Sequence, residues 1–267
     1  MKLFYREIGQ GDPLIILHGL WGASENWLPI ARLLENRFRV ILPDNRNHGQ
    51  SPHSDEMNYD AMSDDIIELI ESLQLPVRPC IAGHSMGGKI VMAILMKKPE
   101  LIRKAVVIDI APIAYTSSDG GRHSKIIDFM SAFNLRSYQT REEIKNAIES
   151  RFKTPQSQQL FLKNIRKTEN GFEWKINHES IQKHFQEISG CPSRLPLSQY
   201  TREILFIKGE HSDLIPTDKT FLYEQFPAAR FIQIPDCGHW LHSEQPEKLA
   251  QAIKTFILPK QRLSSHN

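Results

Sequence analysis

The stretch Gly83-His84-Ser85-Met86-Gly87 decides how this chain of 267 residues is interpreted. It follows a short apolar run, Pro79 to Ala82, and precedes a helix-like run, Lys89 to Met96, so the sequence predicts a strand, a tight turn and a helix. A serine on such a turn has strained backbone angles, and a Cβ atom on either flanking residue would collide across the turn, which explains both glycines. We therefore interpret Ser85 as a candidate nucleophile exposed at the end of a sheet.

Two other interpretations of this stretch have to be weighed. Gly83, Gly88 and Lys89 satisfy the phosphate-loop pattern G-x-x-x-x-G-K, but Ile90 stands where that loop needs a serine or threonine to bind Mg²⁺. An ATPase would thus lack one required hydroxyl. The plainer alternative is an ordinary glycine-bounded turn, and only the partners of a serine nucleophile elsewhere in the chain can decide against it.

Composition limits the class of protein. With 40% hydrophobic and 24% charged residues, the chain fits one globular α/β domain with an insertion, or two small domains. The net charge of +2 and the absence of any run of five basic residues argue against a nucleic-acid partner. Small-molecule substrates are favoured, and we expect a monomer or a homodimer.

Location and metal content are predicted from the same survey. No uninterrupted apolar 18-mer is present and the first ten residues do not resemble a secretion signal, so we expect no membrane span and a cytoplasmic protein. The three cysteines are odd in number and widely spaced (Cys80, Cys191 and Cys237), which suits buried thiols in a reducing compartment. No C-x-x-C pair suggests zinc, and we expect neither a metal nor an organic cofactor.

Short apolar runs alternate with helical patterns over the first half of the chain, as expected for βαβ units in a parallel sheet. The predicted strands are Leu14 to Leu17, Arg39 to Leu42, Pro79 to Ala82 and Lys104 to Ile110, and the predicted helices are Trp27 to Leu34, Asp64 to Leu73 and Lys89 to Met96.

After Pro112 the pattern becomes helical and polar, and the sheet pattern returns near residue 203. We therefore expect an α/β core, 1–112 and 198–260, with a helical lid, 113–197, inserted in it. The lid helices are predicted at Ile126 to Phe133, Glu142 to Phe152 and Gln159 to Ile165; the core resumes with strands Glu203 to Lys208 and Arg230 to Ile234 and a last helix, Glu247 to Ile257.

Apolar side chains of the lid are candidates for the wall of an acyl pocket, although packing within the lid explains the same helical spacing equally well. The lid also carries 13 Lys+Arg against 9 Asp+Glu, which either marks a solvated face or helps to draw in an anionic substrate such as an acyl-CoA. The candidate pocket residues are Ile126, Ile127, Phe129, Met130 and Phe133 of the lid, with Trp21 and Trp240 of the core.

The segment His18-Gly19-Leu20-Trp21-Gly22 directly follows a predicted strand. A loop in that position can offer a backbone amide to a developing oxyanion, so we expect the Leu20 and Met86 N–H groups to form an oxyanion hole. We interpret His18 as a buried histidine that braces this loop. In the turn after the next strand we expect Asp44 to pair with Arg46 in a structural role.

A serine hydroxyl needs a neighbouring imidazole to accept its proton. His239, in Cys237-Gly238-His239-Trp240, follows the last predicted strand and a Pro-Asp turn, which returns it to the sheet edge that carries Ser85. His242 is the nearest competitor, but we expect it to lie in a helical segment.

Two carboxylates could orient that imidazole. Asp109 and Asp213 both end predicted strands, and both preserve the chain order serine, acid, histidine. The orienting carboxylate has to reach the imidazole Nδ1–H, and a single residue of register decides which one does so. A turn-capping aspartate is the structural alternative for either.

Together these elements resemble the α/β-hydrolase fold over nearly the whole chain: a mostly parallel central sheet with helices on both faces and an inserted lid. In finer detail the chain resembles the YbfF-like acyl esterases. The matching blocks are His18 to Gly22, Arg46 to Gly49, Gly83 to Lys89, Ile108 to Pro112, and the lid segment Asn164 to Trp174, which ends near Asn177.

This resemblance implies hydrolysis of carboxylic esters or acyl thioesters with Ser85 and His239 as catalytic residues. In hydrolases of this fold generally, the acid follows a later strand in a register that falls on Ser212 here, with Asp213 one place late. YbfF-like proteins instead use the aspartate that matches Asp109, with a serine at the position of Ser212 as an extra hydrogen-bond partner. We therefore predict Asp109 as the acid, Asp213 as the alternative and Ser212 as a helper.

The sequence thus predicts a serine esterase or thioesterase that works through an acyl-enzyme, with acyl-CoA among its candidate substrates. Two alternatives stay open because a fold does not fix its substrate. One is a C–C bond hydrolase or lyase of a small metabolite, and the other is a hydrolase-like receptor that binds its ligand without turning it over.

Overall fold

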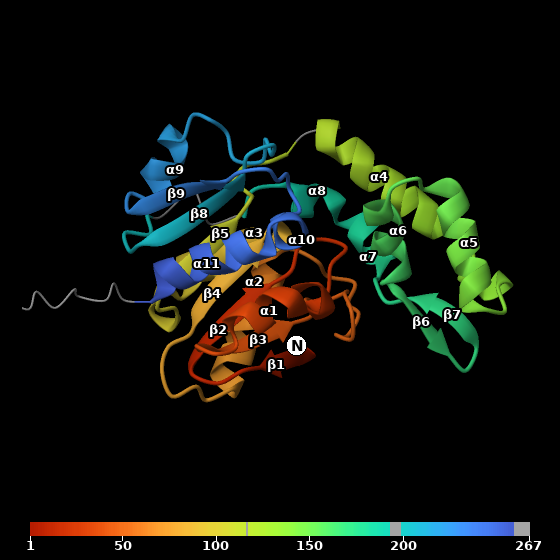
Figure 1. Cartoon of the computed structure of the whole chain (residues 1–267), viewed down its shortest axis with the longest axis horizontal. Helices are drawn as coiled ribbons and strands as arrows, with labels where there is room; N and C mark the ends of the chain where they lie inside the picture. Colours follow the sequence, from red (N-terminus) through yellow and green to blue (C-terminus); the bar gives the residue numbers. More distant parts are fainter. Residues whose placement is uncertain (116, 193–198, 259–267) are drawn as a thin grey trace, which may run out of the picture.

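A seven-stranded sheet in the order β1-β3-β2-β4-β5-β8-β9 forms the centre of the molecule (Figure 1). The computed structural model describes residues 1–115, 117–192 and 199–258. All neighbouring strands are parallel except β1, which runs antiparallel to β3. The strands are β1 Tyr5–Ile8, β2 Asp12–Leu17, β3 Phe38–Pro43, β4 Cys80–His84, β5 Ala105–Ile108, β8 Ile204–Gly209 and β9 Ala229–Ile234.

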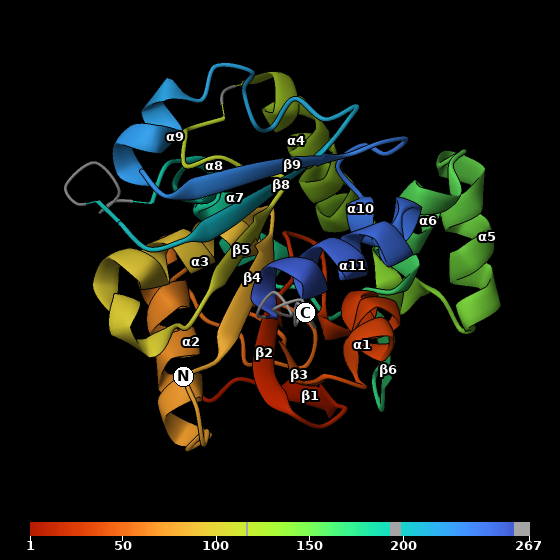
Figure 2. The ribbon, with the colours of Figure 1, turned by 60° about the vertical axis from the view of Figure 1, so that its left-hand side comes forward.

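Helices cover both faces of this sheet (Figure 2). On one face lie α1 (Leu28–Leu34) and α11 (Pro246–Ile257), and on the other lie α2 (Tyr59–Ser72) and α3 (Met86–Lys97). Two further short helices, α9 (Thr220–Gln225) and α10 (Leu241–Glu244), flank β9 in the sequence, and 3-10 turns lie at Ser24–Trp27 and Pro99–Leu101.

The two faces follow from the alternation of side chains along each strand. In β2, Leu14 and Ile16 belong to the apolar cluster beneath α1 and α11, whereas Ile15 and Leu17 belong to the cluster beneath α2 and α3. All four are buried, because a parallel sheet covered on both faces needs apolar residues at every position. This explains why the strands read as continuous apolar runs in the sequence.

The chain between β5 and β8 forms a separate group of helices at one side of the sheet (Figure 1). Phe129, Phe133, Phe152, Phe161 and Trp174 pack together in its interior. The group consists of α4 Ser117–Ala132, a 3-10 turn at Leu135–Ser137, α5 Arg141–Arg151, α6 Pro155–Leu162, the antiparallel strands β6 Ile165–Thr168 and β7 Gly171–Trp174, α7 His178–Lys183 and α8 Phe185–Ser189.

We call the residues from 113 to 192 that the structure describes the insertion. The predicted lid boundary at 197/198 lies outside the described residues, as do 116 within the lid and 259–260 at the end of the core. The exact division into core and lid therefore stays a prediction.

The structure differs from the predicted elements in places with a local cause. Helix α2 begins at Tyr59 and not at Asp64, because the Asn58 side chain accepts a hydrogen bond from the Ala61 amide and caps the helix there. Helix α6 stops short of Ile165, which instead starts the unpredicted β6–β7 hairpin. No described helix is both long and apolar enough to cross a membrane.

Candidate active site

Ser85 occupies a strained turn between β4 and α3. Its backbone angles are φ 53° and ψ −121°, in a region that non-glycine residues rarely adopt. A Cβ atom on Gly83 would lie 2.2 Å from the Gly87 carbonyl oxygen, and one on Gly87 would lie 2.5 Å from the Leu17 carbonyl oxygen. Because both positions are glycine, the backbone segments can approach closely enough to form the turn. The Ser85 at this turn lines a cavity of about 290 Å³.

His239 reaches the same cavity through the loop after β9. Asp236 turns the chain with φ 59°, and the His211 amide donates to the Cys237 carbonyl at 2.9 Å. A Cβ atom on Gly209 would lie 2.2 Å from the Gly238 carbonyl oxygen, so the glycine at the end of β8 lets this loop pack closely. The loop thereby carries His239 to the carboxyl end of the sheet, where β4 delivers Ser85.

His242, the competing histidine, lies in α10 as expected. Its ring stacks on Trp27 with 4.9 Å between ring centroids, and burial lowers the pKa of His242 to about 4. It is not among the residues that line the cavity. His239, and not His242, therefore lines the cavity that Ser85 also lines.

Asp109 is the carboxylate that contacts His239. It follows β5 with φ 52° and is fully buried. The His239 Nδ1–H donates to Asp109 Oδ2 at 2.8 Å, and the Gly209 amide donates to Oδ1 at 3.0 Å. Because Nδ1 carries the proton, the other ring nitrogen of His239, Nε2, is free to act as a base.

Ser212 and Asp213 follow β8 but differ in their contacts. The Ser212 hydroxyl donates a 2.5 Å hydrogen bond to Asp109 Oδ2, so this oxygen accepts from both Ser212 and His239. Asp213 is exposed, although it also lines the cavity. The structure thus brings Asp109 and Ser212 to the imidazole side, and no hydrogen bond joins Asp213 to His239 within the described part of the chain.

His84 supports the His239 loop from the strand that carries the nucleophile. Its Nε2–H donates to the His239 carbonyl oxygen at 2.8 Å, and the two imidazole centroids lie 4.5 Å apart. Burial, and then the neighbouring histidines, lower the pKa of His84 well below its usual value, so the ring is neutral beside His239. Sequence reasoning missed this residue, although its position directly before Ser85 was a usable signal.

Leu20 and Met86 both line the cavity. Met86 is the first residue of α3, so its N–H belongs to the first turn, whose amides have no acceptor within the helix. His18 braces the Leu20 loop as predicted: its Nδ1–H donates to the Gly19 carbonyl, and its Nε2 accepts from the Asn45 amide at 3.0 Å.

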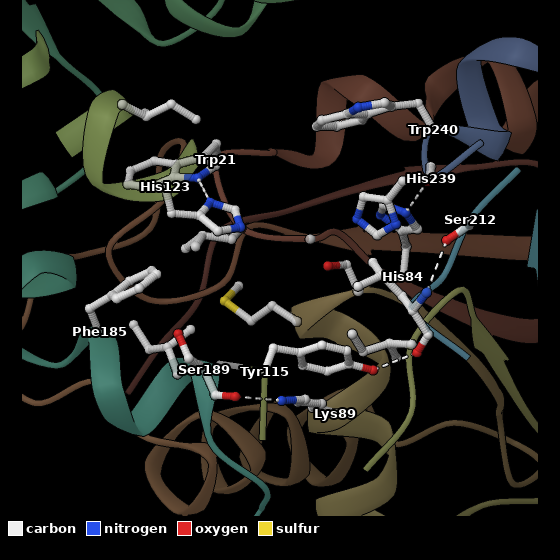
Figure 3. A pocket seen from close by; sticks show the side chains of 18 of the residues that line it. Trp21, His84, Lys89, Tyr115, His123, Phe185, Ser189, Ser212, His239 and Trp240 are labelled. Atoms are coloured by element: carbon white, nitrogen blue, oxygen red, sulfur yellow. Dashed lines mark hydrogen bonds between the residues drawn. The ribbon is translucent and has the colours of Figure 1, made fainter. Parts of the chain in front are cut away.

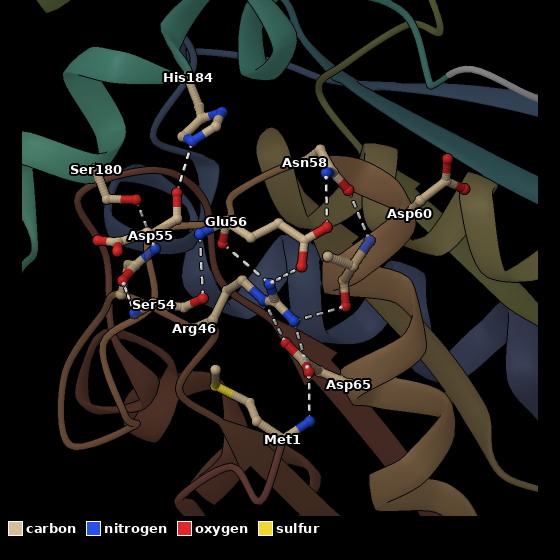
Figure 4. A network of polar contacts seen from close by, with 12 residues as sticks. Met1, Arg46, Ser54, Asp55, Glu56, Asn58, Asp60, Asp65, Ser180 and His184 are labelled. Atoms are coloured by element: carbon tan, nitrogen blue, oxygen red, sulfur yellow. Dashed lines mark hydrogen bonds and ion pairs between the residues drawn. The ribbon is translucent and has the colours of Figure 1, made fainter.

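The predicted pair between Asp44 and Arg46 is wrong. Arg46 binds Asp65 of α2 through two hydrogen bonds of 2.6 and 2.9 Å, in a polar network that also includes Glu56 (Figure 4). Asp44 instead accepts backbone amides, from Ser24 at 2.6 Å and from Gln50 at 2.8 Å. A planar guanidinium takes a carboxylate with two parallel bonds, and α2 presents that carboxylate to Arg46 while the turn itself uses Asp44.

Side chains of both the core and the insertion line the cavity (Figure 3). Trp21, His123 and Phe185 lie on one side of the view, opposite His239 and Trp240. The Trp21 Nε1–H donates to His123 Nδ1 at 2.9 Å and so joins the loop after β2 to α4. Further lining residues are Tyr59, Lys89, Ile110, Tyr115, Ile126, Leu160, Ile188, Ser189, His211 and Leu214.

The residues predicted for the pocket wall fall into two groups. Trp21, Trp240 and Ile126 line the cavity, but Phe129, Met130 and Phe133 do not. The side chains of these three pack inside the insertion, where Phe129 and Phe133 contact the rings of its other helices and hairpin. The helical period of α4 indicated a buried face, but it could not distinguish a face turned to the cavity from one turned to the insertion's own core.

Ile127 is also buried without lining the cavity. Among the residues that the structure describes, no group of three or more His, Cys, Asp or Glu side chains is placed to hold a metal ion.

Comparison with known proteins shows the family of this chain. Residues 12–246 match the family model described as the alpha/beta hydrolase fold. The chain is 35% identical over 261 residues to the sn-1-specific diacylglycerol lipase ABHD11 of Danio rerio, covering 94% of this chain and 80% of that protein. It is 33% identical over 247 residues to Esterase YbfF of Escherichia coli (strain K12), covering 92% and 93%. A solved structure named marine microorganism esterase superposes with a TM-score of 0.91 at 40% identity, covering 96% and 99%.

Proposed function

We propose that this chain, which belongs to the α/β hydrolase fold family and is a carboxylic ester hydrolase, cleaves its substrates through an acyl-enzyme formed on Ser85. The observation that carries this proposal is the shared cavity: Ser85 and His239 both line it, and His239 donates to the buried Asp109 at 2.8 Å. A nucleophile, a base and a group that orients the base are the parts that acyl transfer needs.

The reaction has two halves. His239 Nε2 takes the Ser85 proton as Oγ attacks the ester carbonyl, and the Leu20 and Met86 amides stabilise the oxyanion of the tetrahedral intermediate. The imidazolium then returns the proton to the leaving alcohol, which leaves an acyl-serine. A water molecule, deprotonated by His239, hydrolyses that acyl-serine and restores the enzyme. Asp109 stabilises the imidazolium in both halves, and its own charge is supported by Ser212 and the Gly209 amide.

The cavity size favours small acyl esters. A cavity of about 150 Å³ holds benzene, so a volume of about 290 Å³ corresponds to roughly twelve non-hydrogen atoms. We propose that the apolar side chains of Ile126, Leu160, Phe185 and Ile188 receive the acyl chain. A short or medium acyl ester fits this space as the cavity stands.

Three finer properties remain proposals. Hydrolysis of thioesters, including acyl-CoA, requires only that the same acyl-enzyme form with a thiol as leaving group. All three cysteines are free thiols, which is consistent with a reducing, cytoplasmic location. A monomeric or homodimeric state stays a prediction from composition.

The test is pre-steady-state hydrolysis of p-nitrophenyl acetate and butyrate, followed by assays of the matching acyl-CoA compounds. We expect a burst of p-nitrophenol equal to the enzyme concentration, absent in Ser85→Ala and strongly slowed in His239→Gln. His242→Gln is the matched control and keeps the burst. Full turnover by Ser85→Ala would show that the chemistry lies elsewhere. If the enzyme hydrolyses the oxygen esters but not the acyl-CoA compounds, only the thioester part of the proposal is refuted.

A further inference from the structure

Lys89 lies on α3 one helical turn after Ser85, and its backbone amide donates to the Ser85 carbonyl at 3.2 Å. Its side chain is 2% exposed and lines the cavity. Buried ammonium groups are normally paired with a carboxylate. Within the described part of the chain, no ion pair joins Lys89 to an acidic residue, so other groups have to stabilise its ammonium.

Three backbone carbonyls take the place of that carboxylate. Lys89 Nζ donates to the Ile113 oxygen at 2.9 Å, to the Ser189 oxygen at 3.1 Å and to the Gly190 oxygen at 2.5 Å. Ile113 lies where the chain leaves β5 to enter the insertion. Ser189 and Gly190 lie at the end of α8, its last described helix. One ammonium therefore holds both ends of the insertion to the nucleophile helix.

Two tyrosines complete this anchor. The ammonium lies 4.7 Å from the ring centroid of Tyr115 and 5.7 Å from that of Tyr59, distances at which a cation is attracted to an aromatic face. The Tyr59 hydroxyl donates to the Ile188 carbonyl at 2.6 Å. The groups around Lys89 thus act on the same short segment of α8.

That segment forms part of the cavity wall. Phe185, Ile188 and Ser189 of α8 line the cavity together with Tyr115, and in Figure 3 Lys89, Tyr115 and Ser189 lie together along its lower edge. Ser85, His239 and Asp109 lie on other elements, after β4, β9 and β5, so a shift of α8 would change the room for the acyl chain.

We propose that Lys89 is a positioning residue that determines acyl-chain specificity: by anchoring both ends of the insertion to α3, it fixes the wall that limits how long an acyl group the cavity accepts. This inference rests on the proposed ester hydrolysis. It assigns Lys89 no contact with the reacting atoms.

The anchor also depends on protonation. Burial lowers the pKa of Lys89 to about 7, so the side chain is an ammonium below that pH and a neutral amine above it. A neutral amine has two N–H groups, and one of the three carbonyls then loses its donor. Among the residues that the structure describes, the other titratable side chains near Lys89 Nζ are Tyr59, Tyr115 and Cys191. Burial raises the pKa of Tyr59 and of Cys191, so neither becomes an anion near pH 7.

The experiment compares kcat/KM for p-nitrophenyl octanoate with that for the acetate, in the wild type, Lys89→Met and Lys89→Arg. Lys97→Met is the matched control, because Lys97 lies on the same helix but binds Asp60 and Asp64 and not the insertion. The octanoate-to-acetate ratio should rise at least about tenfold in Lys89→Met, the lower end of what one methylene group is worth in a hydrophobic pocket. Lys89→Arg, which keeps the charge and the N–H donors, should restore part of the discrimination, and Lys97→Met should leave the ratio unchanged.

The same ratio is then measured from about pH 6 to about pH 9 in the wild type. Any pH effect that acts equally on the two substrates cancels in the ratio, so the ratio should rise through an apparent pKa near 7 and should be flat in Lys89→Met. If Lys89→Met does not fold, the wild-type profile decides, and a flat profile overturns the inference.

An unchanged or lowered ratio in Lys89→Met with a full acetate burst overturns the inference and leaves the proposed function standing. An equal rise in Lys97→Met also overturns it, because the effect would then be a general loosening of α3. Absence of an acetate burst in the wild type would instead refute the proposed function.

Discussion

Replacing Asp109 by asparagine should nearly abolish turnover while leaving the fold intact. Asparagine has the same shape but offers one acceptor oxygen in place of two. The Gly209 amide needs an acceptor at the Oδ1 position, so the amide nitrogen of the variant faces the His239 Nδ1–H and the Ser212 hydroxyl. A donor then meets a donor, and His239 has to adopt the tautomer with its proton on Nε2, which cannot accept the Ser85 proton.

The expected loss is about 10⁴ in kcat, as the equivalent change causes in the serine protease triad. That corresponds to about 5.5 kcal/mol of transition-state stabilisation. Asp213→Asn is the matched control: Asp213 is exposed and also lines the cavity, and its replacement should change kcat less than about twofold.

The assay is kcat for p-nitrophenyl butyrate, measured with thermal unfolding to show that both variants fold. A larger loss of kcat in Asp213→Asn than in Asp109→Asn would refute the reasoning and make Asp213 the acid.

Two further predictions follow from packing and from burial. A Cβ atom on Gly209 would lie 2.2 Å from the carbonyl oxygen of Gly238 in the His239 loop, so Gly209→Ala should lower kcat at least about tenfold. A Cβ atom on Gly238 would lie 3.8 Å from its nearest neighbour, so Gly238→Ala should keep most activity in the same assay. Burial lowers the pKa of His48 to about 3 and that of His84 well below its usual value. Below about pH 6.5 the unfolded chain therefore binds more protons than the folded chain. The free energy of unfolding should fall as pH falls through that range, by up to about 1.4 kcal/mol per histidine per pH unit. Urea unfolding between about pH 7 and about pH 5 measures how the free energy of unfolding depends on pH. This slope should be smaller in His48→Gln and unchanged in the control His211→Gln, whose histidine is exposed. A slope that His48→Gln does not alter would contradict the prediction.

The sequence was informative where function depends on backbone geometry. The glycines around Ser85 are required because no Cβ atom fits at Gly83 or Gly87, and that requirement is visible in the sequence itself. The parallel sheet was predicted from the alternation of short apolar runs with helical patterns. The structure explains why those runs are apolar throughout, since the strands are buried on both faces.

The sequence was less informative where function depends on which side chains meet across the fold. Asp109 and Asp213 both end strands in the correct chain order, and spacing alone could not choose between them. The structure separates them because Asp109 adopts φ 52° after β5 and turns its buried carboxylate to His239.

The insertion was the part of the chain that sequence reasoning described least well. Helices were predicted near α4, α5 and α6, but α7, α8 and the β6–β7 hairpin were missed. Phe129, Met130 and Phe133 were candidates for the pocket wall, but they pack inside the insertion. Amphipathic spacing identifies a buried face without identifying what covers it. Lys89 was noticed only as part of an incomplete phosphate loop, because its partners are backbone carbonyls, which leave no trace in a sequence pattern.

The central claim is that Ser85 forms a covalent acyl-enzyme with His239 as its base. Its most direct test is labelling with an alkyl fluorophosphonate, in which Ser85 Oγ bonds to phosphorus, fluoride leaves and the serine proton passes to His239. Peptide mapping by mass spectrometry should find one phosphonyl group per chain, on Ser85, with labelling at least about a hundredfold slower in His239→Gln. A label on another residue, or equally fast labelling without His239, would contradict the account.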